Sequence, residues 1–147
     1  MNKEKIRQAI REYLVPGFAY GIAVNALWLG LAILINMASP GKFMESLGLL
    51  FLIYLALLAG IGFASASRKY GRNKVIAISF IISFTSIAGC SAILLLVLLI
   101  TGVNSFFVIA SAPFMIIGSM FAAAVIAIPN YLVISMSKKA FLKEGNE

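Results

Sequence analysis

The sequence contains no histidine and no aspartate, and its only cysteine is Cys90. Zinc and iron sites need several His, Cys, Asp or Glu ligands that converge on one ion, and one thiol inside an apolar segment does not supply them. A haem held by histidine is excluded for the same reason. A single thiol also forms no disulfide within the chain. We therefore expect no metal site and no cofactor.

Charged residues are missing from two long stretches. From Val75 to Ile100 the only ionisable side chain is the thiol of Cys90, and from Ser105 to Met136 it is the phenol of Tyr131. A serine nucleophile needs a base to activate it, and these segments offer none at comparable depth. Ionisable groups inside a membrane also mark proton relays and ion-coupling sites. The sequence therefore predicts that the protein is not an enzyme, has no catalytic residue and is not a proton-driven transporter.

Apolar residues make up 62% of the 147 positions and charged residues 12%, whereas a soluble domain has about 45–50% and about 25%. A membrane-spanning helix needs about 20 mostly apolar residues. Four stretches meet this requirement: Gly17–Met37, Ser46–Ala66, Val75–Ile100 and Phe106–Ile128. Short links between them place consecutive helices antiparallel. We predict an all-α polytopic integral membrane protein, with four antiparallel transmembrane helices in one bundle and residues 1–147 forming one domain.

Proline and glycine predict where these helices begin and end. Pro16–Gly17 separates an N-terminal segment from the first span, and Ser39–Pro40 fits an N-cap followed by proline at the first helical position. Thr101–Asn104 predicts a tight turn. Pro129–Asn130 is expected to kink or end the fourth helix, which leaves residues 131–136 near the membrane interface.

Lysine and arginine predict the orientation, because short cytoplasmic loops carry an excess of both. The net charge is +7. Three basic clusters fall on one side of a four-span chain, at residues 3–11, 68–74 and 138–143, and the other side carries only Lys42 against Glu45. We expect both termini, including the tail 135–147, in the cytoplasm, and a bacterial cytoplasmic membrane as the location.

The basic loop between the second and third spans is expected to contact anionic lipid headgroups through Arg68, Lys69, Arg72 and Lys74. Nucleic-acid binding is not expected, because no aromatic residues are interleaved with the basic ones.

Residues 1–15 leave two interpretations open. They form either an amphipathic helix that lies on the membrane surface or a polar extension of the first span.

Small and polar residues recur at helical spacing within the spans. In lipid such residues let helices approach closely and hydrogen-bond to each other. Candidate helix-contact glycines are Gly17, Gly21, Gly62 and Gly118. The third span carries a polar stripe of Ser79, Ser83, Ser86 and Cys90. The stripe either packs at the centre of the bundle or lines a polar pathway. Phe51, Phe80, Leu94–Leu96 and Phe121 are left to face lipid or to fill gaps.

Two asparagines and one tryptophan complete the candidate residues. A buried amide in hydrocarbon needs hydrogen-bond partners. We expect Asn25, near mid-depth, to bond a serine such as Ser83 or Ser111, and Asn36 lies near the outer boundary. Trp28 shares a helix face with Asn25, and its indole N–H needs an acceptor. If the chain has a ligand site, the pair Asn25 and Trp28 is where we expect it.

The loop residues 68–75 resemble the loop between the second and third helices of major facilitator transporters, which has an acidic residue followed by Arg, an aromatic residue, Gly and Arg. Arg68 occupies the position of the acidic residue. A basic glycine turn between two helices explains the same residues, and we transfer no function from the resemblance.

These observations favour a non-enzymatic protein that acts by binding a partner within the membrane, as an accessory or regulatory subunit or as an immunity-type protein. The partner is either another membrane protein or a second copy of the chain. One alternative is a small channel or facilitator for uncharged solutes, as a monomer or an oligomer, with Asn25, Asn36 and the serine stripe along its route. A third is a holin-like protein that forms membrane lesions by self-association.

Overall fold

The computed structural model describes residues 3–39, 43–102 and 105–144. Four long helices dominate it: α2 (Val15–Ala38), α3 (Phe43–Ser67), α4 (Arg72–Ile100) and α5 (Ser105–Glu144). Each contains a segment that is long and apolar enough to cross a membrane, and the described residues form no strand. The predicted all-α fold with four membrane-spanning helices is therefore confirmed.

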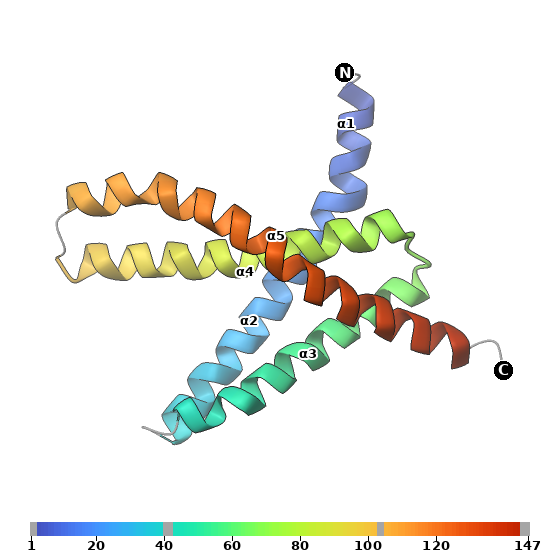
Figure 1. Ribbon diagram of the computed structural model, residues 1–147, viewed down its shortest axis with the longest axis horizontal. Helices are drawn as coiled ribbons and strands as arrows, with labels where there is room; N and C mark the ends of the chain where they lie inside the picture. The colour runs from blue at the N-terminus through green and yellow to red at the C-terminus, as the bar shows by residue number, and fades with distance from the viewer. Residues whose placement is uncertain (1–2, 40–42, 103–104, 145–147) are drawn as a thin grey trace.

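The helices form two hairpins that cross each other (Figure 1). Helix α4 packs along α5 and against α2, and α3 packs against both α5 and α2, so the main contacts run around a ring of four helices. The α2–α3 hairpin and the α4–α5 hairpin meet near the α3–α4 turn and diverge away from it, so the end of α2 and the start of α3 lie far from the end of α4 and the start of α5 (Figure 1). The bundle is thus closed at one end and splayed at the other.

A hydrophobic core lies where the hairpins cross. Leu58 of α3, Ile78 and Ile82 of α4, and Ile134 of α5 are fully buried, and Val24 of α2 packs with them. Of the large side chains expected to face lipid or to fill gaps, Leu95 is half-buried and the others are exposed: Phe51, Phe80, Leu94, Leu96 and Phe121. Most apolar surface therefore lies on the outside, as lipid as a solvent permits.

The N-terminal segment is not separated from the first span at Pro16, contrary to the sequence prediction. Helix α1 (Lys3–Ala9) leads through a π-helical turn, Ile10–Leu14, directly into α2. Proline lacks an N–H and its ring collides with the carbonyl four residues earlier. The wider turn, in which the Val15 N–H bonds the Ile10 carbonyl, accommodates Pro16 in the first turn of α2. No residue of α1 is buried, and α1 extends away from the bundle (Figure 1).

The helix of the fourth span does not end at Pro129, which was one of the two outcomes predicted there, a kink or an end. Helix α5 continues through Pro113 and Pro129 to Glu144, so part of the expected C-terminal tail is helical. Transmembrane helices tolerate proline because neighbouring helices and polar side chains satisfy the freed backbone groups. Asn130, directly after Pro129, is buried and bonds Ser83 of α4, so α5 stays packed against α4 beyond the proline.

The connections also differ in part from expectation. Ser39 is the C-cap of α2, and Pro40 lies outside the described residues, so a helix start there is not tested. Gly102 has φ of +79°, a left-handed conformation that favours glycine, in the turn after α4. The α3–α4 turn is tight, and the Tyr70 N–H donates to the Ser65 carbonyl at 2.9 Å.

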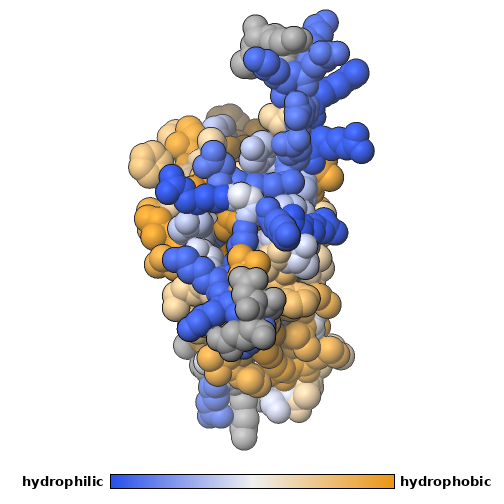
Figure 2. Space-filling view, turned by 90° about the vertical axis from the view of Figure 1, so that its right-hand side faces the viewer, coloured by the Kyte–Doolittle hydropathy of each residue, from blue (hydrophilic) through white to orange (hydrophobic). Residues whose placement is uncertain are grey.

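Hydrophilic side chains gather at the closed end of the bundle and along the N-terminal helix (Figure 2). This end carries the α3–α4 turn and the last turns of α5 (Figure 1). Apolar side chains surround the polar end on the view shown in Figure 2. The structure is therefore polar at one end, as a protein that spans a bilayer needs to be.

Candidate functional site

A cleft of about 640 Å³ lies between the two hairpins, where they begin to diverge. Its lining is almost wholly apolar and comes from all four long helices: Asn25, Trp28, Leu47, Leu50, Phe51, Tyr54, Ser86, Ile87, Cys90, Ser91 and Ile126. We call this the inter-hairpin cleft. Four of the residues singled out from the sequence, Asn25, Trp28, Ser86 and Cys90, lie together in it.

Trp28 fixes one wall of the cleft. Its indole Nε1 donates to the Leu50 carbonyl oxygen of α3 at 3.0 Å, which supplies the acceptor that a buried indole needs. The Trp28 and Tyr54 rings meet edge to face, with centroids 6.2 Å apart and planes at 73°. An aromatic pair of this geometry stabilises the contact beyond its buried area. The wall between α2 and α3 is therefore held by a polar and an aromatic contact.

Asn25 bonds a serine of another helix, as predicted, but this serine is Ser86 of α4, which was not one of the two examples named. The Asn25 Nδ2 donates to the Gly21 carbonyl at 2.6 Å within α2. The single hydroxyl proton of Ser86 lies between Asn25 Oδ1 at 2.8 Å and the Ile82 carbonyl at 2.9 Å. The amide is thus held in one orientation at the floor of the cleft.

A second polar contact ties α5 to α4 and was not singled out from the sequence as a site. Asn130 is 4% exposed, and its Nδ2 donates to the Ser83 hydroxyl at 2.9 Å and approaches the Tyr54 hydroxyl at 3.5 Å. The Ser83 hydroxyl in turn donates to the Ser79 carbonyl. In the sequence, an asparagine directly after a proline is typical of a helix end. Its bond to another helix could have been predicted only from the rule that amides in hydrocarbon need hydrogen-bond partners.

The serine stripe lies at two different depths. Ser79 and Ser83 are fully buried, and each hydroxyl donates to the backbone carbonyl four residues earlier. Ser86 and Cys90 continue the stripe into the inter-hairpin cleft, where Cys90 is exposed. Asn36 is exposed near the end of α2 and does not line the cleft. The stripe is therefore not a continuous exposed surface.

Three of the four candidate glycines lie at helix contacts. A Cβ on Gly17 would come within 2.9 Å of Ile81 Cβ, and one on Gly21 within 3.3 Å of Thr85 Cβ, so both glycines face α4. Gly62 faces α5, where the Ile134 carbonyl oxygen is 2.9 Å from the same position. Gly118 has no neighbour within 4 Å of its Cβ position and faces outward. The Gly17–Gly21 pair thus serves a contact within the chain.

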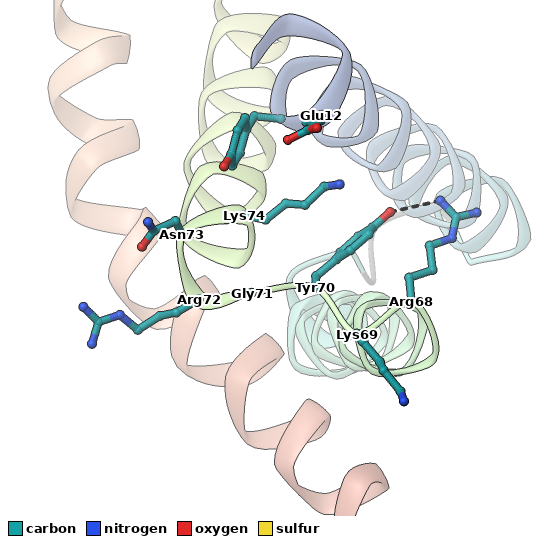
Figure 3. Close-up of a pocket in the computed structure, with 9 residues that line it drawn as sticks. Glu12, Arg68, Lys69, Tyr70, Gly71, Arg72, Asn73 and Lys74 are labelled. Atoms are coloured by element: carbon teal, nitrogen blue, oxygen red, sulfur yellow. Dashed lines mark hydrogen bonds between the residues drawn. The ribbon is translucent and has the colours of Figure 1, made fainter. Parts of the chain in front are cut away.

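The four loop cations expected to meet lipid lie around one cleft of about 590 Å³ at the polar end, together with Glu12. Tyr70 stands at its centre. Its hydroxyl accepts a hydrogen bond from Arg68 at 3.0 Å, and the Lys74 ammonium lies 4.2 Å from its ring centroid. The hydrogen bond to Tyr70 raises the pKa of Arg68, which stays charged. Arg72 points away from Tyr70 (Figure 3).

The four long apolar helices define a polytopic helical membrane protein. Among the described residues no cluster of three or more His, Cys, Asp or Glu side chains is placed to hold a metal ion. Comparison of the chain with protein-family models, with curated proteins and with solved structures gave no match. Function is therefore inferred from the clefts themselves.

The Asn130–Ser83 contact gives a first prediction. In a double-mutant cycle of Asn130→Leu and Ser83→Ala, we expect a coupling energy of about 0.6 kcal/mol, and at most about 1.7, as for other hydrogen bonds between transmembrane helices. The measurement is equilibrium unfolding in mixed detergent micelles. A cycle of Ser83→Ala with Asn36→Leu serves as the control and should show no coupling, because Asn36 is exposed. Equal coupling in both cycles would contradict the assignment.

Proposed function

We propose that the protein acts without chemistry, by binding a transmembrane helix of another membrane protein in the inter-hairpin cleft, as an accessory, regulatory or immunity-type subunit. The observation that carries the proposal is the splayed pair of hairpins, which leaves a cleft of about 640 Å³ lined by all four helices. A bundle that needed only to be stable would gain packing by closing this space.

The residue types in the cleft support binding of a helix. Trp28, Phe51 and Tyr54 are aromatic, and aromatic side chains in pockets supply much of the binding energy at protein interfaces. One N–H of the Asn25 amide donates to the Gly21 carbonyl, and the second N–H can donate to a partner. The Tyr54 hydroxyl accepts from Asn130, so its own proton can also be donated to a partner. Such groups orient a partner helix within hydrocarbon.

The facilitator alternative has less support. Its route would follow Ser79, Ser83 and Ser86, but the first two side chains are fully buried and bonded to their own helix. A water-filled route needs polar groups that face an opening, whereas the inter-hairpin cleft is mostly apolar. The third alternative, a holin-like protein that forms membrane lesions by self-association, is tested by the photocrosslinking experiment described below.

For the location, we propose a bacterial cytoplasmic membrane with the polar end and both termini in the cytoplasm. The support is that the basic residues of the α3–α4 turn and of the last turns of α5 gather at one end of the bundle. An excess of lysine and arginine in short loops marks the cytoplasmic side.

Site-specific photocrosslinking tests the proposal in intact cells. A benzophenone side chain replaces Phe51, which lines the cleft, or Phe121, which is 78% exposed and does not line it. We expect a discrete protein adduct from position 51 and only lipid adducts from position 121, because a bound helix occupies the cleft. Lipid adducts alone from both positions would refute binding of a protein, and adducts of the chain with itself would favour self-association.

A filled cleft gives the matching loss of function. Cys90→Trp places a bulky side chain in the cleft, and because Cys90 is exposed the change leaves the buried core intact. This substitution should reduce the position-51 adduct at least tenfold. Ile93→Trp adds the same side chain to an exposed position of α4 outside the cleft and should leave the adduct unchanged. An adduct that survives Cys90→Trp would show that the partner contacts another surface.

A further inference from the structure

A second cleft at the polar end differs from its neighbours in charge. It has a volume of about 420 Å³ and lies between the start of α4 and the last turns of α5. Its charged lining residues are Arg72, Lys138 and Lys139, and no carboxylate of the described residues lines it. The two other clefts at this end both include Glu12. Of these three clefts, the one between α4 and α5 therefore attracts a negatively charged ligand without an opposing acid.

The three cations come from two helices. Arg72 is the first residue of α4, where the helix dipole adds partial positive charge. Lys138 is half-buried, and its ammonium donates to the Tyr70 carbonyl oxygen, which leaves further N–H groups for a ligand. Lys139 is exposed. Ser135 also lines the cleft and brings a hydroxyl group.

The basic cleft continues into an apolar groove. The groove has a volume of about 410 Å³ and runs along the same two helices, and it shares Arg72 and Tyr131 with the basic cleft. Its other lining residues are Ile76, Phe80, Ala124, Ala127 and Ile128. The two alanines keep the groove open between larger side chains. A cationic cleft thus joins an apolar groove that lies within the membrane-spanning part of both helices.

We propose that this face of the α4–α5 hairpin binds an anionic phospholipid. The phosphate lies in the basic cleft, among Arg72, Lys138 and Lys139, and an acyl chain lies in the groove beside Phe80. A soluble phosphate would use only the cleft, and a partner helix only the groove, so the junction of the two selects a phospholipid. The site shares no lining residue with the inter-hairpin cleft and does not depend on the proposed function.

Native mass spectrometry of the full chain in detergent tests the proposal, with phosphatidylglycerol and phosphatidylcholine of equal chain length as probes. We expect phosphatidylglycerol to bind at least tenfold more tightly. Arg72→Gln with Lys139→Gln should weaken its binding about tenfold or more, because each cation near a membrane surface contributes about a fivefold gain. Lys3→Gln with Lys5→Gln removes the same charge from α1, which extends away from the bundle, and should change binding less than twofold. Equal losses in both double variants would mean unspecific attraction and would overturn the proposal.

Two further measurements test the groove and the source of the phosphate. Ala124→Phe fills the groove and should weaken phosphatidylglycerol binding, whereas Val125→Phe, at an exposed neighbour outside the groove, should not. Inorganic phosphate at millimolar concentration should not displace the lipid. Efficient displacement would identify a site for soluble anions instead, and unchanged binding by Ala124→Phe would exclude the acyl groove. Circular dichroism of each variant separates loss of binding from loss of helical fold.

Discussion

Gly62→Ala should destabilise the protein by about 2–3 kcal/mol, although it adds only one methyl group. The new Cβ would lie 2.5 Å from Ser137 Cβ and 2.9 Å from the Ile134 carbonyl oxygen. Neither atom is the far end of a flexible side chain, so α3 and α5 must move apart to admit the methyl group. Thermal unfolding in detergent would register the change as a lower midpoint temperature.

Gly60 provides the matched control two residues away on α3. Nothing lies within 4 Å of its Cβ position. Alanine is favoured over glycine inside a helix by about 0.5–1 kcal/mol. Gly60→Ala should therefore be neutral or slightly stabilising, opposite in sign to Gly62→Ala. If both substitutions have the same effect, the close approach of α3 to α5 at Gly62 is wrong.

Leu58→Ala should destabilise the protein by about 1–2 kcal/mol, less than the same change in a soluble protein. Leu58 is fully buried where the hairpins cross and packs in one cluster with Ile78, Ile82 and Ile134. In water such a truncation costs about 2–5 kcal/mol. In lipid the unfolded helices keep their side chains in an apolar solvent, so the transfer term cancels and the loss of packing remains. Equilibrium unfolding in mixed detergent micelles measures the difference.

The same truncation on the outside of α3 isolates the packing contribution. Leu52 is 63% exposed, so Leu52→Ala removes a side chain that contacts lipid in the folded and unfolded states alike. We expect a change below about 0.5 kcal/mol. Comparable losses for Leu52→Ala and Leu58→Ala would mean that the crossing of the hairpins does not form the core.

Local sequence signals predicted the helices better than their ends. The four apolar stretches appear as helices, because about 20 apolar residues in lipid must form a helix to satisfy their backbone groups. Pro16 was wrong as a helix boundary, and of the two outcomes predicted at Pro129, a kink or a helix end, the helix end was wrong. Each proline removes one backbone donor, but a π-helical turn accommodates Pro16, and α5 continues through Pro129 while it packs along α4 and α3.

The candidate site was predicted only in part. Asn25 and Trp28 share a helix face, and spacing along one helix was enough to place them together. The sequence did not select Ser86 over Ser83 as the partner of Asn25, because both serines belong to the same stripe of α4. Tyr54 and Asn130 reach the cleft region from other helices, and no pattern within a single helix connects residues on three helices.

The sequence by itself determined that lipid is the solvent of this chain and that it has four helices to cross it, because hydropathy and charge are local properties of each segment. Only the tertiary structure decided which faces meet. Gly62 lies against α5, while Gly118 faces outward. Asn130, which directly follows Pro129, bonds Ser83 of α4. Large apolar residues lie on most sides of each span, so hydropathy alone does not select an inner face, and the stripes of small residues do not say which helix each one meets. That choice depends on the crossing of the two hairpins, which close packing between distant segments sets.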